Sequence, residues 1–161
     1  MSSGSLSSRR SESGMTLVEI LITVVILASG LLGMAALQTR SISYNSIAYL
    51  NSLSNIIAYD MLDRIKANPV YAVDGPGYSA SVGNVPTTYP DDCDTADCTP
   101  SELARYDIEQ WKFILDAQLP NADGSIVRTD TPEGRNYTIT VFFDDSKGQQ
   151  PRRQVILRST M

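Results

Sequence analysis

The chain has 161 residues, 18 acidic side chains against 13 basic ones, a formal net charge of −5 and no histidine. The excess of acid disfavours nucleic-acid binding, which depends on basic side chains that neutralise phosphates. Without histidine, Ser-His-Asp catalysis, Cys-His catalysis and histidine-ligated zinc are excluded. We therefore expect a protein that is not an enzyme and binds no cofactor, no metal and no nucleic acid.

The first segment, residues 1–14, is polar and serine-rich, carries Arg9 and Arg10, and ends in Gly14. Basic residues next to a membrane helix favour the cytoplasmic side. This pattern predicts a leader peptide that stays in the cytoplasm.

An apolar run extends from Met15 to Leu37, and Glu19 is its only charged residue. At about 1.5 Å per residue, a helix of this length spans a bilayer core of roughly 30 Å. A carboxylate at that depth costs about 2.5 kcal/mol or more unless it is protonated or paired. A cut between Gly14 and Met15 would create an α-amine one helical turn from Glu19, within its reach in the same chain or in a packed neighbour.

The sequence from Gly14 to Glu19 resembles the class III signal of type IV pilins and pseudopilins. In that family a prepilin peptidase removes the basic leader and N-methylates the new first residue. The acid five residues past the cleaved glycine helps each subunit register against the next in a helical fibre. The resemblance implies that Met15 is methylated and Glu19 is the registering acid, although the first mature residue of the family is usually Phe.

An ordinary secretory signal is the alternative to this prediction. Its apolar region is usually about 7–15 residues long and precedes the cut. Gly33-Met34-Ala35 offers a small-x-small site near the end of the run. Sequencing of the mature N-terminus separates the two, because the pilin signal leaves Met15 first and the secretory signal leaves Ala36.

Beyond the run, apolar residues recur at spacings of three and four, which predicts one helix from about Thr16 to Lys66. Asn68-Pro69 should end it, because proline lacks an N–H and disfavours helical geometry in the preceding residue. Residues 15–37 would then be a membrane or fibre-core helix, and residues 38–68 its amphipathic half. The predicted apolar stripe comprises Tyr44, Ile47, Leu50, Ser54, Ile57, Met61, Leu62 and Ile65.

Gly30 and Gly33 lie inside the apolar run and allow two interpretations. Small residues let helices approach closely in lipid. Alternatively, they mark a stretch that loosens when the helix enters a fibre, as the resemblance to pilins implies.

Residues 69–100 are rich in turn-forming residues and predict a long loop with no regular structure. Cys93 and Cys98 within it predict a disulfide, because the N-terminus indicates export. Four aspartates surround the cysteines, at positions 91, 92, 94 and 97. They could bind calcium, but their spacing is not that of an EF-hand, so a solvated acidic loop is the preferred interpretation.

The remaining segments predict one helix and a small sheet. Thr99-Pro100-Ser101-Glu102 is a capping box that should begin a helix, and Pro120 should close it. Trp111 falls on the apolar stripe of this helix and is expected in the core, whereas Asp107, Glu109 and Asp116 are expected on solvated faces. Alternating residues predict strands over 125–129, 137–143 and 154–159.

These elements predict an α+β fold in which a long N-terminal helix packs on an antiparallel sheet, the arrangement that pilins have. Residues 69–161 would form a globular periplasmic head. Several segments look similar to those of the minor pilins called pilus modification protein PilV. They are the long leader, residues 30–38, residues 61–69 and the helix with Asp107, Trp111 and Leu115.

That resemblance implies a non-catalytic minor pilin, held in the inner membrane before it joins the pilus, and at its tip in particular. Its expected partners are the prepilin peptidase, other minor and major pilins, the pilus assembly platform, a tip adhesin and inner-membrane lipid. Its expected roles are assembly priming, adhesion and twitching motility.

Two alternatives to this function remain open. The first is a minor pseudopilin of type II secretion, whose N-terminal segment has the same physical properties. The second is a signal-anchored periplasmic domain that binds a small ligand or ion, for example through the loop from Asp91 to Asp97.

Overall fold

The structure is a computed structural model that describes residues 14–146 and 148–161. The predicted leader, with Arg9 and Arg10, lies outside the described residues except for Gly14. The chain divides into two compact units, one up to Tyr44 and the other from Asn45 to Met161. We describe each unit by itself.

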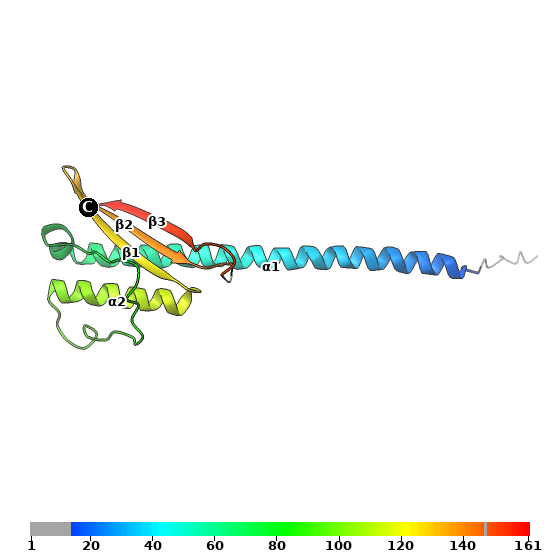
Figure 1. Ribbon diagram of the computed structural model, residues 1–161, viewed down its shortest axis with the longest axis horizontal. Helices are drawn as coiled ribbons and strands as arrows, with labels where there is room; N and C mark the ends of the chain where they lie inside the picture. The colour runs from blue at the N-terminus through cyan, green and yellow to red at the C-terminus, as the bar shows by residue number, and fades with distance from the viewer. Residues whose placement is uncertain (1–13, 147) are drawn as a thin grey trace, which may run out of the picture. The chain divides into compact units, whose positions relative to one another are not determined.

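Helix α1 spans Leu17–Ala67 (Figure 1), within one residue of the predicted helix at either end. It ends immediately before Asn68-Pro69, as expected from the missing N–H of proline. Its N-terminal part is apolar on every side, and its C-terminal part carries one buried stripe. The residues buried along α1 are Ser54, Ile57, Ala58, Met61, Leu62 and Ile65.

Tyr44 was predicted to belong to this stripe, but its side chain is exposed. Ile47 and Leu50 are half-buried, and full burial along the stripe begins at Ser54, within the unit that starts at Asn45.

The segment after α1 is more ordered than the predicted structureless loop. A short π-helical turn, η1, spans Val70–Asp74, and its Ala72 is fully buried. Tyr78 is also fully buried, and Ala80 forms an isolated antiparallel bridge with Ile126. Buried side chains therefore fix the first part of this segment in the domain.

Helix α2 spans Pro100–Gln118 and has the predicted capping box between Thr99 and Glu102. The hydrogen bond from Thr99 lowers the pKa of the Glu102 carboxyl. Trp111 is fully buried, as predicted, and its indole Nε1 donates a hydrogen bond of 3.0 Å to the backbone oxygen of Ile57. The tryptophan thus joins α2 to α1.

Three strands form one antiparallel sheet in the order β1-β2-β3. They span Asp123–Thr131, Gly134–Phe143 and Arg153–Thr160, so each is longer than the sequence pattern predicted. Pro132 and Glu133 alone connect β1 to β2, and Gly134 accommodates a φ of 151° after this tight reversal.

The core lies between the sheet and the two helices (Figure 1). Tyr137, Ile139, Val141 and Phe143 alternate along β2 and point into it. They meet the stripe of α1 and the apolar face of α2, including Trp111 and Leu115. The predicted α+β architecture is confirmed, with a helix packed on a small antiparallel sheet.

Candidate functional site

The predicted processing site lies just before α1. Gly14 and Met15 precede the helix, and Glu19 lies in its first turn. The backbone N–H of Glu19 bonds to the carbonyl oxygen of Thr16 at 3.0 Å and lies 3.3 Å from the Thr16 hydroxyl. Thr16 thus acts as an N-terminal cap, which explains locally why the helix begins at Leu17.

Glu19 lies in the first turn of α1, where the partial positive charge of the helix N-terminus attracts an acidic side chain. A second positive charge at the α-amine of Met15 would act in the same direction. The roles of Gly14, Met15 and Glu19 in cleavage, methylation and register remain predictions.

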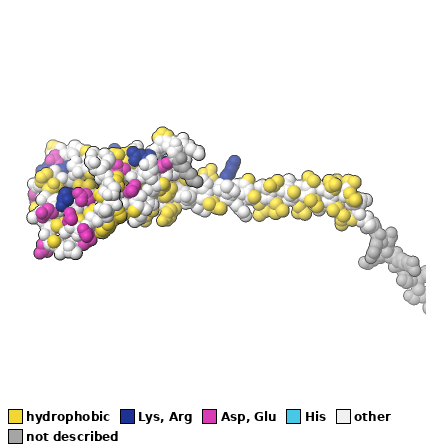
Figure 2. Space-filling model, turned by 60° about the horizontal axis from the view of Figure 1, so that its bottom comes forward, with side chains coloured by type: hydrophobic (Ala, Val, Ile, Leu, Met, Phe, Trp, Pro, Cys, Tyr) yellow, Lys and Arg dark blue, Asp and Glu magenta, His cyan; other side chains and the backbone are white. Residues whose placement is uncertain are grey.

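The apolar part of α1 has no covering partner within the described residues. Side chains from Met15 to Leu37 are all exposed, with Leu17 at 78% and Leu37 at 69%. Figure 2 shows hydrophobic side chains along this helix. An apolar surface of this extent indicates insertion into lipid or burial against other helices.

Length and composition identify α1 as the one helix, among the described residues, that is long and apolar enough to cross a membrane. No residue of its most apolar stretch is buried. Polar side chains in this region bond back to the helix: Thr23 Oγ1 to the oxygen of Glu19 at 2.6 Å, and Ser29 Oγ to that of Ile26 at 2.8 Å. The helix therefore satisfies these hydroxyls internally, as a lipid environment requires.

Gly30 and Gly33 lie within continuous α-helix, and a Cβ added to either would meet nothing within 4 Å. The described chain thus uses neither glycine for internal packing. Both of the interpretations drawn from the sequence remain open.

Cys93 and Cys98 form the predicted disulfide. Two of the surrounding acids are engaged with α2: Asp92 pairs with Arg105 at 3.1 Å, and Asp94 accepts a hydrogen bond from the Tyr106 hydroxyl. Burial, followed by this hydrogen bond, raises the pKa of Tyr106. No group of three or more potential metal ligands was found among residues 14–146 and 148–161. Asp92 and Asp94 thus attach the disulfide-closed loop to α2.

A buried polar network connects the two helices, and the sequence analysis missed it. Asp107, expected on a solvated face, is only 5% exposed. Arg64 of α1 donates to Asp107 at 3.4 Å and also to Gln110, and the Tyr78 hydroxyl donates to Asp107 at 2.7 Å. Asn68 donates to the Tyr78 oxygen at 3.1 Å and to the backbone of Pro100.

Burial is the main influence on the acidity of this network. It raises the pKa of the Asp107 carboxyl, against the opposing effects of the Tyr78 hydroxyl and the Arg64 guanidinium. Burial, assisted by Asp107, also raises the pKa of Tyr78, so that this hydroxyl remains a donor. One available signal was the position of Asp107 four residues before Trp111, on the same helical face.

Lys112 is a second buried charge that the sequence analysis missed. It is 3% exposed and pairs with Asp123 at 3.3 Å, at the start of β1. Its ammonium also donates to the backbone oxygens of Ser81 and Gly83. Lys112 thereby holds the segment after Tyr78 against the sheet.

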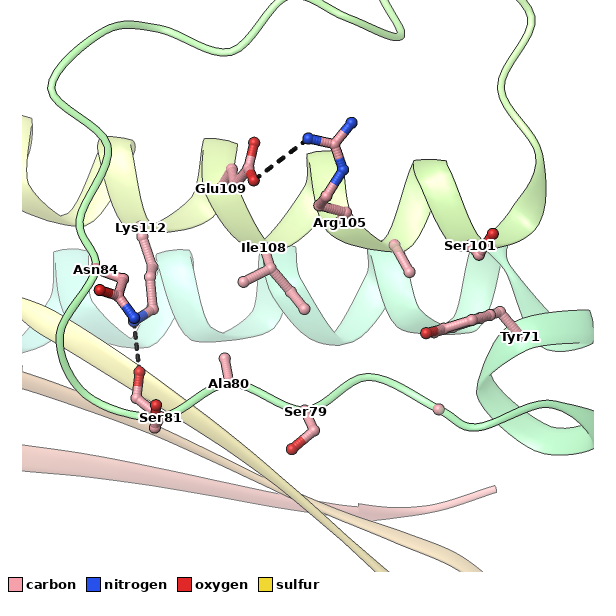
Figure 3. Close-up of a pocket in the computed structure, with 12 residues that line it drawn as sticks. Tyr71, Ser79, Ala80, Ser81, Asn84, Ser101, Arg105, Ile108, Glu109 and Lys112 are labelled. Carbon is pink, nitrogen blue, oxygen red and sulfur yellow. Dashed lines mark hydrogen bonds and ion pairs between the residues drawn. The ribbon is translucent and has the colours of Figure 1, made fainter.

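A cavity of about 470 Å³ lies between α2 and the segment around residues 79–84 (Figure 3). Arg105, Ile108, Glu109 and Lys112 line it from α2. Tyr71 closes one end, and Asn84 lies near Lys112 at the other. We call this feature the α2 groove.

Two family models match the chain. The model described as type IV pilin Tt1218 matches residues 36–109, and that of the prokaryotic N-terminal methylation motif matches residues 9–35. No curated protein and no solved structure gives a match. The matches end within α2, so the sheet lies outside the matched residues.

The fold and these two matches support the type IV pilin family: a prepilin methylation motif precedes a type IV pilin domain. The motif implies processing by a prepilin peptidase and assembly with other pilins. Together with the apolar helix, it fits anchoring in the inner membrane and incorporation into a pilus. Proteins of this family are generally structural and non-catalytic.

Proposed function

We propose that the chain is a minor type IV pilin that takes part in priming and assembling the pilus and supports pilus-dependent adhesion or twitching motility. The observation that carries the proposal is an uncovered apolar helix that begins three residues after Gly14 and has an acid in its first turn. The match of residues 9–35 to the methylation motif supports it further.

In this proposal a prepilin peptidase cuts between Gly14 and Met15 and methylates the new amine of Met15. Residues 1–14 are the leader, residues 15–37 the membrane and later fibre-core helix, residues 38–68 the amphipathic half, and residues 69–161 the periplasmic head. Before assembly, Glu19 meets its own amine. In the fibre it meets the amine of a neighbouring subunit, which sets the axial register.

The minor-pilin assignment is supported by the segment that resembles PilV, residues 61–69. This segment supplies Arg64 and Asn68 to the buried polar network. The segment that resembles PilV therefore includes two residues, Arg64 and Asn68, that join α1 to α2 and to Tyr78. We further propose that the chain lies at the tip of the pilus, that it associates there with a tip adhesin, and that it contacts the pilus assembly platform.

The substitution Glu19→Leu tests the registering role. We expect membrane insertion to be intact, because leucine suits lipid better than a carboxylate, and incorporation into sheared pili to fall about tenfold or more. Thr23→Val is the matched control one turn further along the helix, and it should incorporate normally. Normal incorporation of the Glu19→Leu variant would contradict the role.

Mass spectrometry of the assembled protein tests the processing step independently. We expect a chain that begins at N-methylated Met15. A chain that retains residues 1–14, or begins at Ala36, would overturn the proposal.

Deletion of the gene identifies the assembly system. Loss of surface pili or of twitching motility, with normal secretion of enzymes, is the expected result. Loss of enzyme secretion with normal pili would instead assign the chain to a type II secretion pseudopilus.

A further inference from the structure

The α2 groove is held open by structure on both sides. The segment that forms one wall is fixed by the Ala80–Ile126 bridge, whose backbone bonds measure 3.0 and 2.8 Å. Lys112 holds the same wall through Ser81 and Gly83. The other wall is α2, a capped helix of 19 residues. Such a groove keeps its shape without a ligand, which lowers the entropic cost of binding one.

The charged groups of the α2 groove are already paired. Arg105 lies 3.1 Å from Asp92 and 3.6 Å from Glu109. Lys112 is paired with Asp123. The groove therefore offers no uncompensated charge to an ionic ligand, and an ion would have to displace an existing pair.

Three other polar groups of the α2 groove have no hydrogen-bond partner among the described residues. The Tyr71 hydroxyl, the Ser81 hydroxyl and the Asn84 amide make no hydrogen bond to any other described residue. They lie around an apolar centre, where Ala80 and Ile108 point toward each other from opposite walls (Figure 3). Hydroxyl and amide groups both donate and accept hydrogen bonds, so they match a ligand with many hydroxyls.

Tyr71 adds an aromatic surface at one end of the groove. Its ring stands edge-on to that of Tyr78, with centroids 5.8 Å apart, so its orientation is fixed by a buried neighbour. The groove thus combines paired charges, hydroxyls without a partner, an apolar centre and an aromatic ring of fixed orientation. These features fit a neutral molecule that has apolar C–H faces and hydroxyl groups at its edges. Saccharides have this character, and the groove volume of about 470 Å³ lies within the usual range for ligand sites.

We propose that the α2 groove binds a neutral saccharide, with Tyr71 and Asn84 as hydrogen-bonding residues at its two ends. This site is separate from the N-terminal assembly segment and does not rest on the proposed pilin role. It would give the chain a recognition function of its own.

The test uses the processed full chain in dodecylphosphocholine micelles, a detergent without a sugar head group. Saturation-transfer NMR and calorimetry measure the binding of glucose, galactose, N-acetylglucosamine and lactose up to ~10 mM, a range suited to weak, millimolar affinity. N-acetylneuraminic acid and glucosamine serve as charged comparisons. We expect at least one neutral saccharide to bind and the charged sugars to bind more weakly.

Two variants with matched controls locate the site. Tyr71→Phe removes one hydroxyl, and Asn84→Gly removes one amide while keeping the φ of 55° favourable. Each should weaken binding about three- to tenfold, the effect of one hydrogen bond. The controls are Tyr59→Phe, on an exposed tyrosine of α1, and Asn121→Gly, at a φ of 49° outside the groove. Both should leave affinity unchanged.

Thermal midpoints equal to that of the wild type will show that the groove variants are folded. The proposal is overturned by the absence of neutral saccharide binding, by a preference for a charged sugar, or by equal losses in the groove and control variants. Glu19→Leu should leave saccharide binding intact, so that failure of this proposal is distinguishable from failure of the assembly role.

Discussion

Lys112 is a buried cation whose removal should destabilise the domain far more than removal of an exposed cation from the same helix. Its side chain is 4% exposed, and that of its partner Asp123 is 6% exposed. Its ammonium also bonds to Ser81 and Gly83. The substitution Lys112→Met keeps most of the side-chain volume and removes only the charge and its donors.

The expected loss follows from what remains around Asp123. Removing one partner of a buried ion pair costs about 3–5 kcal/mol, because the other charge stays buried. Asp123 keeps two backbone donors, the N–H groups of Gly124 and Gly83, which places the loss near the lower end. The carbonyls of Ser81 and Gly83 belong to exposed residues, so water can replace the ammonium there. We expect a loss of about 3 kcal/mol and a thermal midpoint lowered by roughly 10–15 °C.

Arg105→Met is the matched control. Arg105 lies on the same helix and also pairs with two acids, but its side chain is 58% exposed. Exposed pairs contribute about 0–1 kcal/mol, so this variant should remain close to the wild type. Urea unfolding of the full chain in detergent can be followed by the fluorescence of Trp111, which is the only tryptophan and fully buried.

The double variant Lys112→Met/Asp123→Asn sharpens the test, because removing the second charge should recover part of the loss. Equal losses for Lys112→Met and Arg105→Met would refute the reasoning. So would a double variant whose loss is the sum of the two single losses, since partners in a pair must couple.

Three further predictions concern the same domain. Burial raises the pKa of Asp107, so the folded chain holds its proton more tightly than the unfolded chain. Its stabilising contribution is complete below the ordinary carboxyl pKa of 3.8 and is lost as pH rises through the folded-state pKa. The unfolding free energy of the wild type should therefore fall with pH relative to Asp107→Asn, and a difference that rises with pH would contradict this. Gly124→Ala should lower the thermal midpoint by the equivalent of about 2 kcal/mol, because its Cβ would overlap the buried ring of Trp111. An unchanged midpoint would show that the ring can move. Replacing Cys93 and Cys98 by serine should cost about 2 kcal/mol in urea unfolding, a small effect because the closed loop is short. A loss above about 4 kcal/mol would mean that the disulfide fixes more than its own loop.

Both long helices could be predicted from the sequence to within about one residue. Their ends depend on local chemistry: proline after α1, and a capping box before α2. The pairing of the three strands also followed from alternation and short reversals. The strands were predicted too short, since the ladder extends into polar residues such as Thr131 and Arg153 that show no apolar alternation.

The polar interior could not be predicted in the same way. Asp107 and Lys112 have charged side chains, and a charge in a helix is usually solvated. Their burial depends on partners that the chain brings from elsewhere: Arg64 lies 43 residues before Asp107, and Asp123 lies on another element than Lys112. The order of residues 69–83 was missed for the same reason, because Tyr78 is held by Asp107 and by Tyr137 of β2.

The sequence by itself determined the apolar run from Met15 to Leu37 with its single acid, the motif at Gly14 and the spacing of the two cysteines. Each of these features depends on residues that are close together in the sequence. The run is apolar along its whole length, the motif is a short contiguous segment, and the disulfide closes a short loop, so none of them needs a distant partner. Only the tertiary structure decided where the charges of α2 lie and that a groove with paired charges and free hydroxyls opens beside them. A charge can be buried only where a distant segment supplies its counter-charge, and that meeting exists only in the folded chain.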